Sequence, residues 1–420
     1  MARIVLSSWG SYGDLFPYLA IATALRAGGH TAELCTCPFY REIVEREGFG
    51  FHPLRPDVRP DDTALLSRIM DPRRGSEVII RELVVGALGQ TVDDIAAAAA
   101  GADLLVSHPI TFAAPLVAES RGLPWLATVL APLSFFSMSD FPALPNAPQV
   151  VRITRRFPWA ARALMAIARR ITASWVAPVE ALRAELGLPP AGDPLYEGQF
   201  SPHGTLALFS TALGDVQPDW PARTTVTGFP FYNRAIPMPD ELAAFLDAGE
   251  PPIVFTLGSA AVNAAGSFFE ESARAAQALG RRAVLLVGPR PANRPANLGA
   301  GIMAVESAPH DRLFPRASVV VHQGGVGTTG QAMRSGRPQL IVPHAHDQPD
   351  NAVRVERLGA ARVLYPQRYR AAKVAGELRR LLEDATYGDD AAAVATRVRS
   401  EDGAAAAAAA ILAVLPSGRR

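Results

Sequence analysis

Short apolar runs, each followed by turn residues and a helical pattern, recur along the chain of 420 residues. Runs of Val, Ile and Leu without polar alternation are typical of strands buried on both faces of a parallel sheet. The first runs predict strands at 4–8 and 31–36, with a glycine-rich loop and a helix at 18–27 between them. This alternation predicts an α/β fold built from βαβ units.

A second series of apolar runs begins at 253–257, after a proline-containing segment with Pro237 and Pro239. The length of the chain also favours two domains, each with its own core. The pattern divides the chain in this order: a first domain at 1–230, a linker at 231–240, a second domain at 241–402 and a last helix at about 403–418.

One turn in the second domain has the features that an anion requires. A strand at 319–321 ends in His-Gln-Gly-Gly-Val-Gly-Thr-Thr (322–329), and a helix follows. The glycines allow backbone N–H groups to approach an anion closely, and a helix N-terminus carries partial positive charge. We expect His322 to face the same space, and the hydroxyls of Thr328 and Thr329 to cap the helix or bind a phosphate. A turn that needs glycine only for its backbone is the alternative, and no Gly-Lys-Ser/Thr follows as in a Walker loop.

Composition and charge exclude several classes of protein. The chain has 41 Lys and Arg against 40 Asp and Glu, so its net charge of +1 gives no strong attraction to nucleic acid. Cys35 and Cys37 lack partners for a metal site and are predicted to be buried strand residues. The first residues lack a signal-peptide pattern, and no apolar run is long enough to span a bilayer. We therefore expect a cytoplasmic protein.

The first glycine-rich loop (9–17) does not fit a dinucleotide site, because it lacks the G-x-G-x-x-G spacing and no acid ends the second strand. Asp14 is the candidate for chemistry in this loop. A carboxylate within hydrogen-bond reach can take the proton of an attacking hydroxyl group. Asp14 can also cap the helix that follows, and the two roles are compatible.

Further residues are candidates for ligand contacts in the first domain. His108 ends a strand on the edge where open α/β sheets bind ligands, and is a second candidate base or a histidine bound to backbone. Phe135 and Phe136 begin an apolar loop at 134–144 that would line a cleft for an apolar ligand. A basic helix at 159–176 would either lie on an anionic membrane or present a solvated face.

Taken together, these motifs resemble those of family 1 glycosyltransferases. The segment 322–329, then Gly-Arg-Pro (336–338) and Pro-x-x-x-Asp-Gln-x-x-Asn (343–351), is similar to the donor-binding signature of that family. The segment Ser-Ala-Pro-His (307–310) fits the same signature, and Gly-Ser-x-Gly-Asp-x-x-Pro (10–17) resembles its N-terminal acceptor-side loop. The similarity is closest to bacterial enzymes of the sterol, macrolide, glycopeptide and rhamnolipid type.

The resemblance implies the GT-B fold: two facing Rossmann-like, doubly wound domains with the active site in the interdomain cleft, and a last helix that crosses back to the first domain. It implies inverting transfer of a hexose from a UDP- or dTDP-sugar to a hydroxyl of an apolar small molecule, such as a natural product, phenol, sterol, macrolide or lipid. Many relatives, including the plant enzymes, have histidine as general base in the first loop, where this chain has Asp14. Because no two aspartates stand two apart, we expect no metal and no cofactor besides the nucleotide-sugar cosubstrate.

The resemblance also implies roles for individual residues. Asp14 and His322 are the predicted catalytic residues. The predicted donor contacts are Ser259, Ala308, His310, His322, Gly324, Gly325, Gly327, Thr328, Thr329, Asp347 and Gln348. The predicted acceptor contacts are Ser11, Tyr12, His108, Phe135, Phe136 and His346. Serine stands at Ser307, where plant enzymes have tryptophan, so the base would be held by backbone at Ala308 and His310, and UDP and dTDP both stay open.

Two other functions remain as alternatives on this architecture. One is a nucleotide-sugar epimerase, which the apolar loop at 134–144 disfavours. The other is a non-catalytic partner subunit, which the presence of Asp14, His322, Asp347 and Gln348 disfavours. The expected partners are a nucleotide-sugar donor and an apolar acceptor, with no nucleic acid and at most weak contact with a membrane surface. We expect a monomer or a homodimer.

Overall fold

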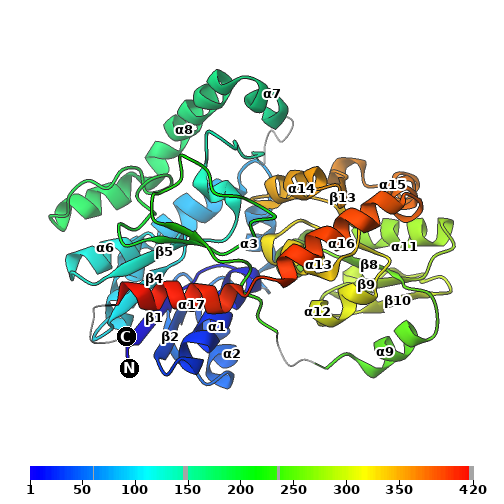
Figure 1. The fold of residues 1–420 in the computed structure, drawn as a ribbon, viewed down its shortest axis with the longest axis horizontal. Coiled ribbons are helices and arrows are strands. Elements are labelled where there is room, and N and C mark those ends of the chain that lie inside the picture. Colours follow the sequence, from blue (N-terminus) through cyan, green and yellow to red (C-terminus); the bar gives the residue numbers. More distant parts are fainter. Residues whose placement is uncertain (60, 145–149, 234–236, 416–420) are drawn as a thin grey trace.

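Two parallel β-sheets form the centres of two lobes (Figure 1). The computed structural model describes residues 1–59, 61–144, 150–233 and 237–415. The first sheet has the order β3-β2-β1-β4-β5-β6-β7 and the second β10-β9-β8-β11-β12-β13. Every pair of neighbouring strands is parallel. The strands are β1 Arg3–Ser7, β2 Thr31–Thr36, β3 Gly50–Pro53, β4 Leu104–Ser107, β5 Trp125–Val129, β6 Thr205–Ala207, β7 Thr224–Val226, β8 Ile253–Thr256, β9 Ala283–Leu286, β10 Ile302–Val305, β11 Val319–His322, β12 Gln339–Ile341 and β13 Ala361–Val363.

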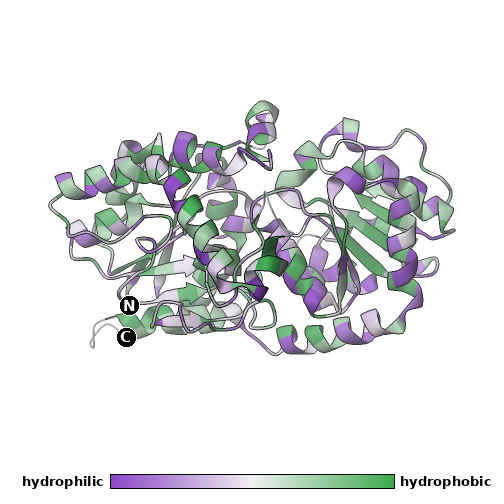
Figure 2. Cartoon of the chain, turned by 90° about the horizontal axis from the view of Figure 1, so that it is seen from above, coloured by the Kyte–Doolittle hydropathy of each residue, from purple (hydrophilic) through white to green (hydrophobic). Residues whose placement is uncertain are grey.

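Helices cover both sheets, as the strand order of a doubly wound fold requires. Apolar strands lie inside each lobe and polar positions lie mainly on the helices (Figure 2). The helices are α1 Tyr12–Ala27, α2 Arg41–Arg46, α3 Thr63–Ile69, α4 Gly75–Glu77, α5 Leu88–Ala98, α6 Ala113–Ser120, α7 Val151–Arg156, α8 Pro158–Glu185, α9 Asp240–Asp247, α10 Gly258–Ala261, α11 Phe268–Ala278, α12 His310–Leu313, α13 Val326–Ser335, α14 Gln348–Arg357, α15 Ala371–Glu383, α16 Ala385–Arg399 and α17 Gly403–Val414.

The strand order places one switch point in each sheet, between β1 and β4 in the first and between β8 and β11 in the second. At a switch point the connections leave toward opposite faces, which opens a crevice at the carboxyl ends of the strands. The GT-B architecture expected from the sequence is therefore present. The helix α17 follows α16 and packs against α1 in the first lobe, with Ala407 and Ile411 in the core of that lobe (Figure 1). Residues 416–418 of the predicted last helix lie outside the described residues.

Two predicted helices differ from the observed ones. The helix predicted at 18–27 begins at Tyr12, because the glycine-rich loop forms its first turn. Between α4 and α6 the chain forms a π-helix, η2 (Val78–Val85), followed by α5. The backbone is tight there, since a Cβ added to Gly86 would lie 2.1 Å from the carbonyl oxygen of Glu82. The basic helix predicted at 159–176 extends over the whole of α8.

The two cysteines are buried, as the sequence predicts, and burial raises the pKa of both thiols, that of Cys37 to about 11. Neither thiol therefore ionises at neutral pH. Within the described part of the chain, none of the helices combines the length and apolarity that crossing a bilayer requires.

Candidate active site

The first turns after β1 and β11 meet between the two lobes. A Cβ added to Gly327, in the first turn of α13, would lie 3.9 Å from the Cα atom of Gly13, in the first turn of α1. Both turns lie at the carboxyl ends of strands that border a switch point. The structure thus brings together the loop predicted to hold a general base and the turn predicted to bind an anion.

The carboxylate of Asp14 caps α1 and lies in its first turn. Its Oδ2 accepts hydrogen bonds from the backbone N–H of Ser11 (2.7 Å) and from the Ser11 hydroxyl (3.0 Å), while the Gly13 N–H donates to the Ser11 Oγ (3.2 Å). This is a capping box with aspartate in place of glutamate. Glycine is required at Gly10, which has φ +132°, because a Cβ there would lie 2.4 Å from Asp14 Oδ2.

The other carboxylate oxygen of Asp14 faces His108, which follows β4. The distance from His108 Nε2 to Asp14 Oδ1 is 3.4 Å. The backbone N–H of Ile110 donates to His108 Nδ1, which assigns the ring proton to Nε2 and makes that nitrogen the donor to Asp14. Burial raises the pKa of Asp14, but the hydrogen bonds from His108 and Ser11 outweigh it and hold the pKa below its ordinary value. The Asp14 side chain is 33% exposed, so an ionised carboxylate opens onto the cleft.

The N-terminus of α13 is open. Its N-cap residue is Gly325, and no side chain caps the helix. Gly324 has φ +86°, and a Cβ there would lie 3.0 Å from the carbonyl oxygen of Gln348, so the turn requires glycine at this position. The Val326 N–H donates to Asp347 Oδ2 (3.2 Å), and the N–H groups that follow in the first turn have no intrahelical acceptor. Gly327 is exposed, so this end of the helix can receive an anion.

The structure corrects the predicted position of His322. The ring is fully buried and does not face the anion space. Its Nδ1 accepts from the Gly324 N–H (3.1 Å), and its Nε2 therefore donates to the Gln339 side-chain oxygen (2.9 Å). Burial lowers the pKa of His322 to about 4, so the ring is neutral. With both nitrogens bonded inside the protein, His322 holds the glycine turn and is not itself a phosphate donor in this structure.

The two threonine hydroxyls are also less accessible than predicted. Thr328 Oγ1 accepts from the Gln323 side-chain amide at 3.3 Å. Thr329 is fully buried, and its hydroxyl has no hydrogen-bond partner within the described residues. Neither residue caps α13, because the N-cap lies at Gly325. The backbone of the turn, rather than its hydroxyls, is what the structure presents to the cleft.

Asp347 and Gln348 lie at the N-terminus of α14. Asp347 Oδ2 accepts from the Asn351 side-chain amide (2.7 Å), and burial, with a smaller contribution from the negative charge of Asp14, raises the pKa of Asp347 to about 7 despite that bond. Gln348 is buried, and its Oε1 accepts from the N–H groups of His344 (2.8 Å) and Ala345 (3.1 Å). The amide oxygen of Gln348 is thus bonded to the loop, which leaves its NH₂ group as the donor for a ligand.

His346 belongs to the second domain by sequence but contacts the first. It has φ +56°, a backbone conformation that a side chain larger than glycine rarely adopts. A Cβ added to Gly75, at the start of α4, would lie 3.3 Å from His346 Cε1. Burial lowers the pKa of His346, so the imidazole is neutral. The strained backbone presents this ring to the first domain.

The remaining predicted donor contacts lie at the carboxyl end of the second sheet. Ser259 is exposed in α10, and Ala308 is half-buried beside α12. The His310 ring stacks on Phe314 at 4.4 Å between centroids, and burial lowers the pKa of His310 to about 4. His310 is therefore a neutral, fixed ring.

The predicted acceptor aromatics divide between core and cavity. Phe135 stacks on Trp220 (3.9 Å between centroids, 14° between planes), and Phe136 packs edge-on against Tyr196 (4.9 Å). Tyr12 packs against Phe16 and other rings at the start of α1. Phe135 and Phe136 border a cavity of about 320 Å³. The other residues that line this cavity are Met138, Met165, Arg169, Tyr196, Glu197, Phe200, Asp219, Trp220 and Pro221. Sequence analysis missed Tyr196, Phe200 and Trp220, because they stand in segments without a motif.

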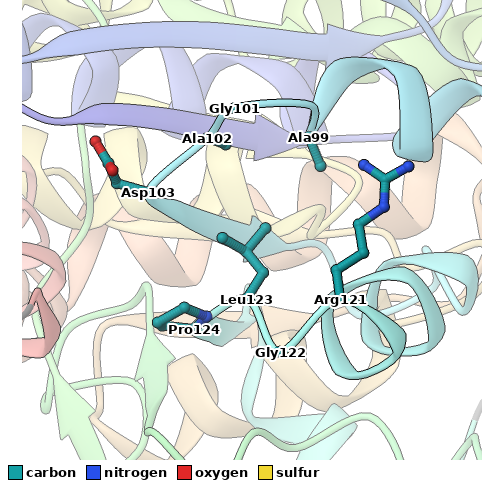
Figure 3. Close-up of a pocket in the computed structure, with 8 residues that line it drawn as sticks. All are labelled: Ala99, Gly101, Ala102, Asp103, Arg121, Gly122, Leu123 and Pro124. Atoms are coloured by element: carbon teal, nitrogen blue, oxygen red, sulfur yellow. The ribbon is translucent and has the colours of Figure 1, made fainter.

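A second hollow of similar volume lies at the amino ends of β4 and β5, and Figure 3 shows its lining. It is lined by Ala99, Gly101, Ala102, Asp103, Arg121, Gly122, Leu123 and Pro124. Open α/β sheets bind their ligands at the opposite, carboxyl edge. The Arg121 side chain donates to the carbonyl oxygen of Ala96 (2.6 Å), and we assign no ligand to this hollow.

The fold and the cleft define a class: a two-domain α/β enzyme with an ionised carboxylate on one side of the cleft and an open helix N-terminus on the other. Models of known families match both halves. Residues 4–133 match the glycosyltransferase family 28 N-terminal domain, and residues 275–414 match the C-terminal domain of erythromycin biosynthesis protein CIII-like proteins.

Individual proteins agree with the family models. The O-mycaminosyltylonolide 6-deoxyallosyltransferase of Streptomyces fradiae is 34% identical over 373 residues, which are 86% of this chain and 84% of that protein. The crystal structure of the kitacinnamycin glycotransferase has a TM-score of 0.75 at 21% identity and covers 99% of each chain. The structure of the glycosyltransferase VinC in complex with dTDP has a TM-score of 0.68 at 19% identity, over 98% of this chain and 99% of that one. The chain belongs to the family 1 GT-B glycosyltransferases.

Proposed function

We propose that this glycosyltransferase moves a hexose from a UDP- or dTDP-sugar to a hydroxyl of an apolar small molecule, with inversion at the anomeric carbon and without a metal. The observation that carries the proposal is the contact between the two turns, at 3.9 Å from Gly13 to the Cβ position of Gly327. It puts the ionised Asp14 carboxylate next to the open N-terminus of α13. One turn suits proton removal and the other suits binding of a diphosphate.

In the proposed reaction, Asp14 acts as general base. The acceptor hydroxyl donates its proton to the Asp14 carboxylate as its oxygen forms the new bond to the anomeric carbon. The bond from that carbon to the β-phosphate oxygen breaks on the opposite face, and the nucleoside diphosphate leaves. His108 is a positioning residue, because its Nε2–H donates to one carboxylate oxygen of Asp14 and this hydrogen bond favours the ionised form.

The leaving diphosphate requires a partner for its negative charge. We assign this role to the N–H groups of Gly325, Gly327 and Thr328 and to the dipole of α13. His322 acts behind the turn, since it accepts from the Gly324 N–H. Among the described residues, no cluster of three or more His, Cys, Asp or Glu side chains is arranged to hold an ion. The proposal includes no cofactor other than the nucleotide-sugar cosubstrate.

Asp347 and Gln348 are the proposed partners of the sugar hydroxyls. A raised pKa allows the Asp347 carboxyl group to accept or, when protonated, to donate a hydrogen bond near neutral pH. Ala308 and His310 are the proposed contacts to the nucleotide base, and Ser259 is a proposed contact to the diphosphate. The dTDP named in the VinC structure supports dTDP alongside UDP.

The cavity beside Phe136 and Tyr196 is the proposed site for the apolar part of the acceptor. Aromatic rings and Met side chains line most of it, which suits a ligand with a large apolar body. The Streptomyces fradiae relative is named for an O-mycaminosyltylonolide acceptor, which supports a natural product as acceptor for this chain too. His346, Ser11 and Tyr12 would approach the reacting hydroxyl from the cleft.

A donor panel tests the proposal. The protein is incubated with UDP-glucose or dTDP-glucose, each with and without 4-methylumbelliferone and a set of macrolide aglycones, and products are separated by mass. Glycoside formation with one donor, and a β-configured product from an α-configured donor by NMR, support the proposal. A new nucleotide sugar formed without acceptor would indicate an epimerase, and no reaction with any pair would overturn the proposed transfer.

We propose one further, weaker contact, with an anionic membrane surface. The helices α7 and α8 protrude from the first lobe (Figure 1), and Trp159 on α8 is 67% exposed. The chain has no acidic residue between Asp140 and Glu180, while Arg162 and Arg170 are exposed in that interval. Flotation with phosphatidylglycerol vesicles should retain the protein at low salt, and Trp159→Ser should weaken retention. Equal flotation with uncharged phosphatidylcholine vesicles would contradict an electrostatic contribution to membrane binding.

The oligomeric state is a separate question, and analytical ultracentrifugation decides between monomer and homodimer.

A further inference from the structure

A buried ion-pair network joins the acceptor-side loop of the first domain to α14 of the second. Arg354 on α14 is 4% exposed and bonds with two carboxylates: its Nη1 donates to Asp140 Oδ2, and its Nε donates to Asp350 Oδ2 at 2.7 Å. Asp350 is 1% exposed, and its other oxygen accepts from the backbone N–H of Ala143 at 2.9 Å. Arg357 also donates to Asp140, at 3.3 Å. The loop thus contacts α14 at both Asp140 and Ala143.

The same loop borders the aromatic cavity. Phe136 and Met138 line it, and the intervening Ser137 donates from its hydroxyl to Asp219, another lining residue, at 2.7 Å. The Met138 N–H donates to the second oxygen of Asp219 at 2.5 Å. The N–H of Asp140 donates to the Ser137 Oγ at 3.1 Å, which closes the turn. A side chain or ligand that moves the cavity wall therefore moves Asp140 with it.

At its other end, α14 carries the proposed sugar contacts. Asp347 is the N-cap residue of α14 and Gln348 is its first residue. Asp350 follows within the same turn, and Arg354 lies one turn further on. Because a helix is stiff over this distance, displacement of Asp350 and Arg354 displaces Asp347 and Gln348. One continuous series of contacts therefore leads from the cavity wall to the proposed sugar site.

We propose that the network of Asp140, Arg354 and Asp350 is a positioning device, which couples the acceptor loop at 137–144 to the sugar-binding end of α14. When a nucleotide sugar engages Asp347 and Gln348, α14 is fixed, and the loop is fixed through Arg354. The wall of the acceptor cavity is then ordered before the acceptor arrives. This inference rests on the proposed function, because it takes Asp347 and Gln348 as sugar contacts.

The charges of the network fit such a device better than a merely stabilising role. A buried ion pair adds little net stability over apolar residues of the same size, because the desolvation of both ions opposes their attraction. Breaking it is costly, however, since a charge is left buried without a partner. Arg354 pairs with Asp350 of its own helix and with Asp140 of the other domain. Both ion pairs therefore form only when the loop holds Asp140 beside α14.

Hydrogen exchange tests the coupling without knowledge of the acceptor. The probe is UDP-glucose or dTDP-glucose, whichever the wild-type protein binds by calorimetry. In the wild type, the probe should slow amide exchange both in the first turn of α14 and in the loop at 137–144, by about 10-fold, within the usual range for coupled sites. In Asp140→Asn, the probe should still slow amide exchange in α14, but its effect on exchange in the loop should fall below about 2-fold.

Two variants keep the test decisive. Arg354→Lys retains the positive charge but has no planar fork to reach both carboxylates, so it should also uncouple the loop; it serves if Asp140→Asn folds poorly. Arg362→Met is the control, because Arg362 pairs with Glu377 inside the second domain and does not bridge to the loop. It should behave as the wild type does.

The outcomes separate this inference from the proposed function. If the probe binds the wild type but leaves the loop unchanged, or if Asp140→Asn still transmits the full protection, the coupling is absent and the transferase proposal stands. If neither nucleotide sugar binds the wild type, the proposed donor site is wrong and the inference fails with it.

Discussion

The two turns that meet in the cleft satisfy the N–H groups of their helices in different ways. In the first, the Ser11 and Asp14 side chains cap α1. In the second, the N-cap is Gly325, no side chain caps α13, and one N–H group bonds with the distant Asp347. Both turns follow a parallel strand at a switch point of a doubly wound sheet, so the backbone architecture is the same.

The difference in capping separates two chemical roles on one architecture. A carboxylate at a helix N-terminus is held in place and kept ionised by N–H donors and the dipole, which suits a base of fixed geometry. A helix N-terminus without its own side-chain cap keeps its N–H groups for a ligand, which suits a leaving diphosphate. The distance of 3.9 Å between Gly13 and the Cβ position of Gly327 lets the two roles act on one substrate pair.

The largest expected effect comes from removing the charge of the capped turn. Asp14→Asn should lower kcat by about 10²–10⁴-fold while fold and nucleotide affinity are retained, because an amide still caps α1 but takes no proton. Steady-state rates and calorimetric dTDP or UDP affinity check this. The matched control is Asp402→Asn, which alters the capping residue of α17 and should leave the rate unchanged. If Asp14→Asn keeps more than half of the wild-type turnover, Asp14 is only a cap.

Converting the open turn into a capped one should produce the next effect. Gly325 has φ −61° and ψ 142°, which any residue can adopt, and its added Cβ would approach the side-chain amide of Gln323 at 2.8 Å, so that amide must shift. Gly325→Asp should weaken nucleotide-diphosphate affinity by about 10–100-fold, because a carboxylate would occupy the N–H groups and repel the phosphates. Gly325→Ser, which caps without charge, should weaken it less. Unchanged calorimetric affinity in both variants would place the diphosphate elsewhere.

The comparison also shows what could be predicted from the sequence. The two-domain α/β fold follows from buried strand runs and glycine turns, and the positions of Asp14 and of the glycine turn follow from motifs of local spacing. The burial of His322 could not be predicted, since it depends on Gln339, a residue of the neighbouring strand. The same holds for the Arg354 network and for Trp220, whose partners lie far away in the sequence. Local geometry is encoded locally, whereas access to the cleft is set by tertiary packing.

His322→Ala distinguishes support of the open turn from direct phosphate contact. With the ring buried, we expect a cavity and two unpaired polar groups, at Gln339 and Gly324, and a loss of about 2–4 kcal/mol of unfolding free energy. Nucleotide affinity of the folded protein should fall by no more than about 10-fold. Gln339→Met should show the same combination in thermal unfolding and calorimetry. A loss of about 10²–10³-fold in kcat/KM at unchanged melting temperature would instead restore His322 as a direct donor.

A smaller effect is expected from the histidine behind the base. Asp14 accepts a proton only when ionised, so kcat/KM falls as the pH drops through the pKa of Asp14. In the wild type, His108 and Ser11 hold that pKa below its ordinary value against the effect of burial. His108→Gln weakens one of the interactions that lower the pKa of Asp14, so this pKa should rise. The acid limb of the pH–rate profile should then move to higher pH, with rates near pH 8 within about 10-fold of wild type. An unmoved acid limb would show that His108 does not act on Asp14.

The smallest expected effect is that of a chelator. Transferases that use a divalent cation hold it against the diphosphate with carboxylates. In the proposed diphosphate site of this chain, the partners are instead the N–H donors of α13. The nearby Asp347 carboxylate already bonds with Val326 and Asn351. Transfer should therefore change by less than about 2-fold on addition of EDTA, since the helix N-terminus supplies the charge stabilisation. The assay should be repeated with Mg²⁺ and Mn²⁺ after dialysis against chelator. Stimulation beyond about 10-fold, reversed by EDTA, would mean that an ion rather than the open turn neutralises the leaving group.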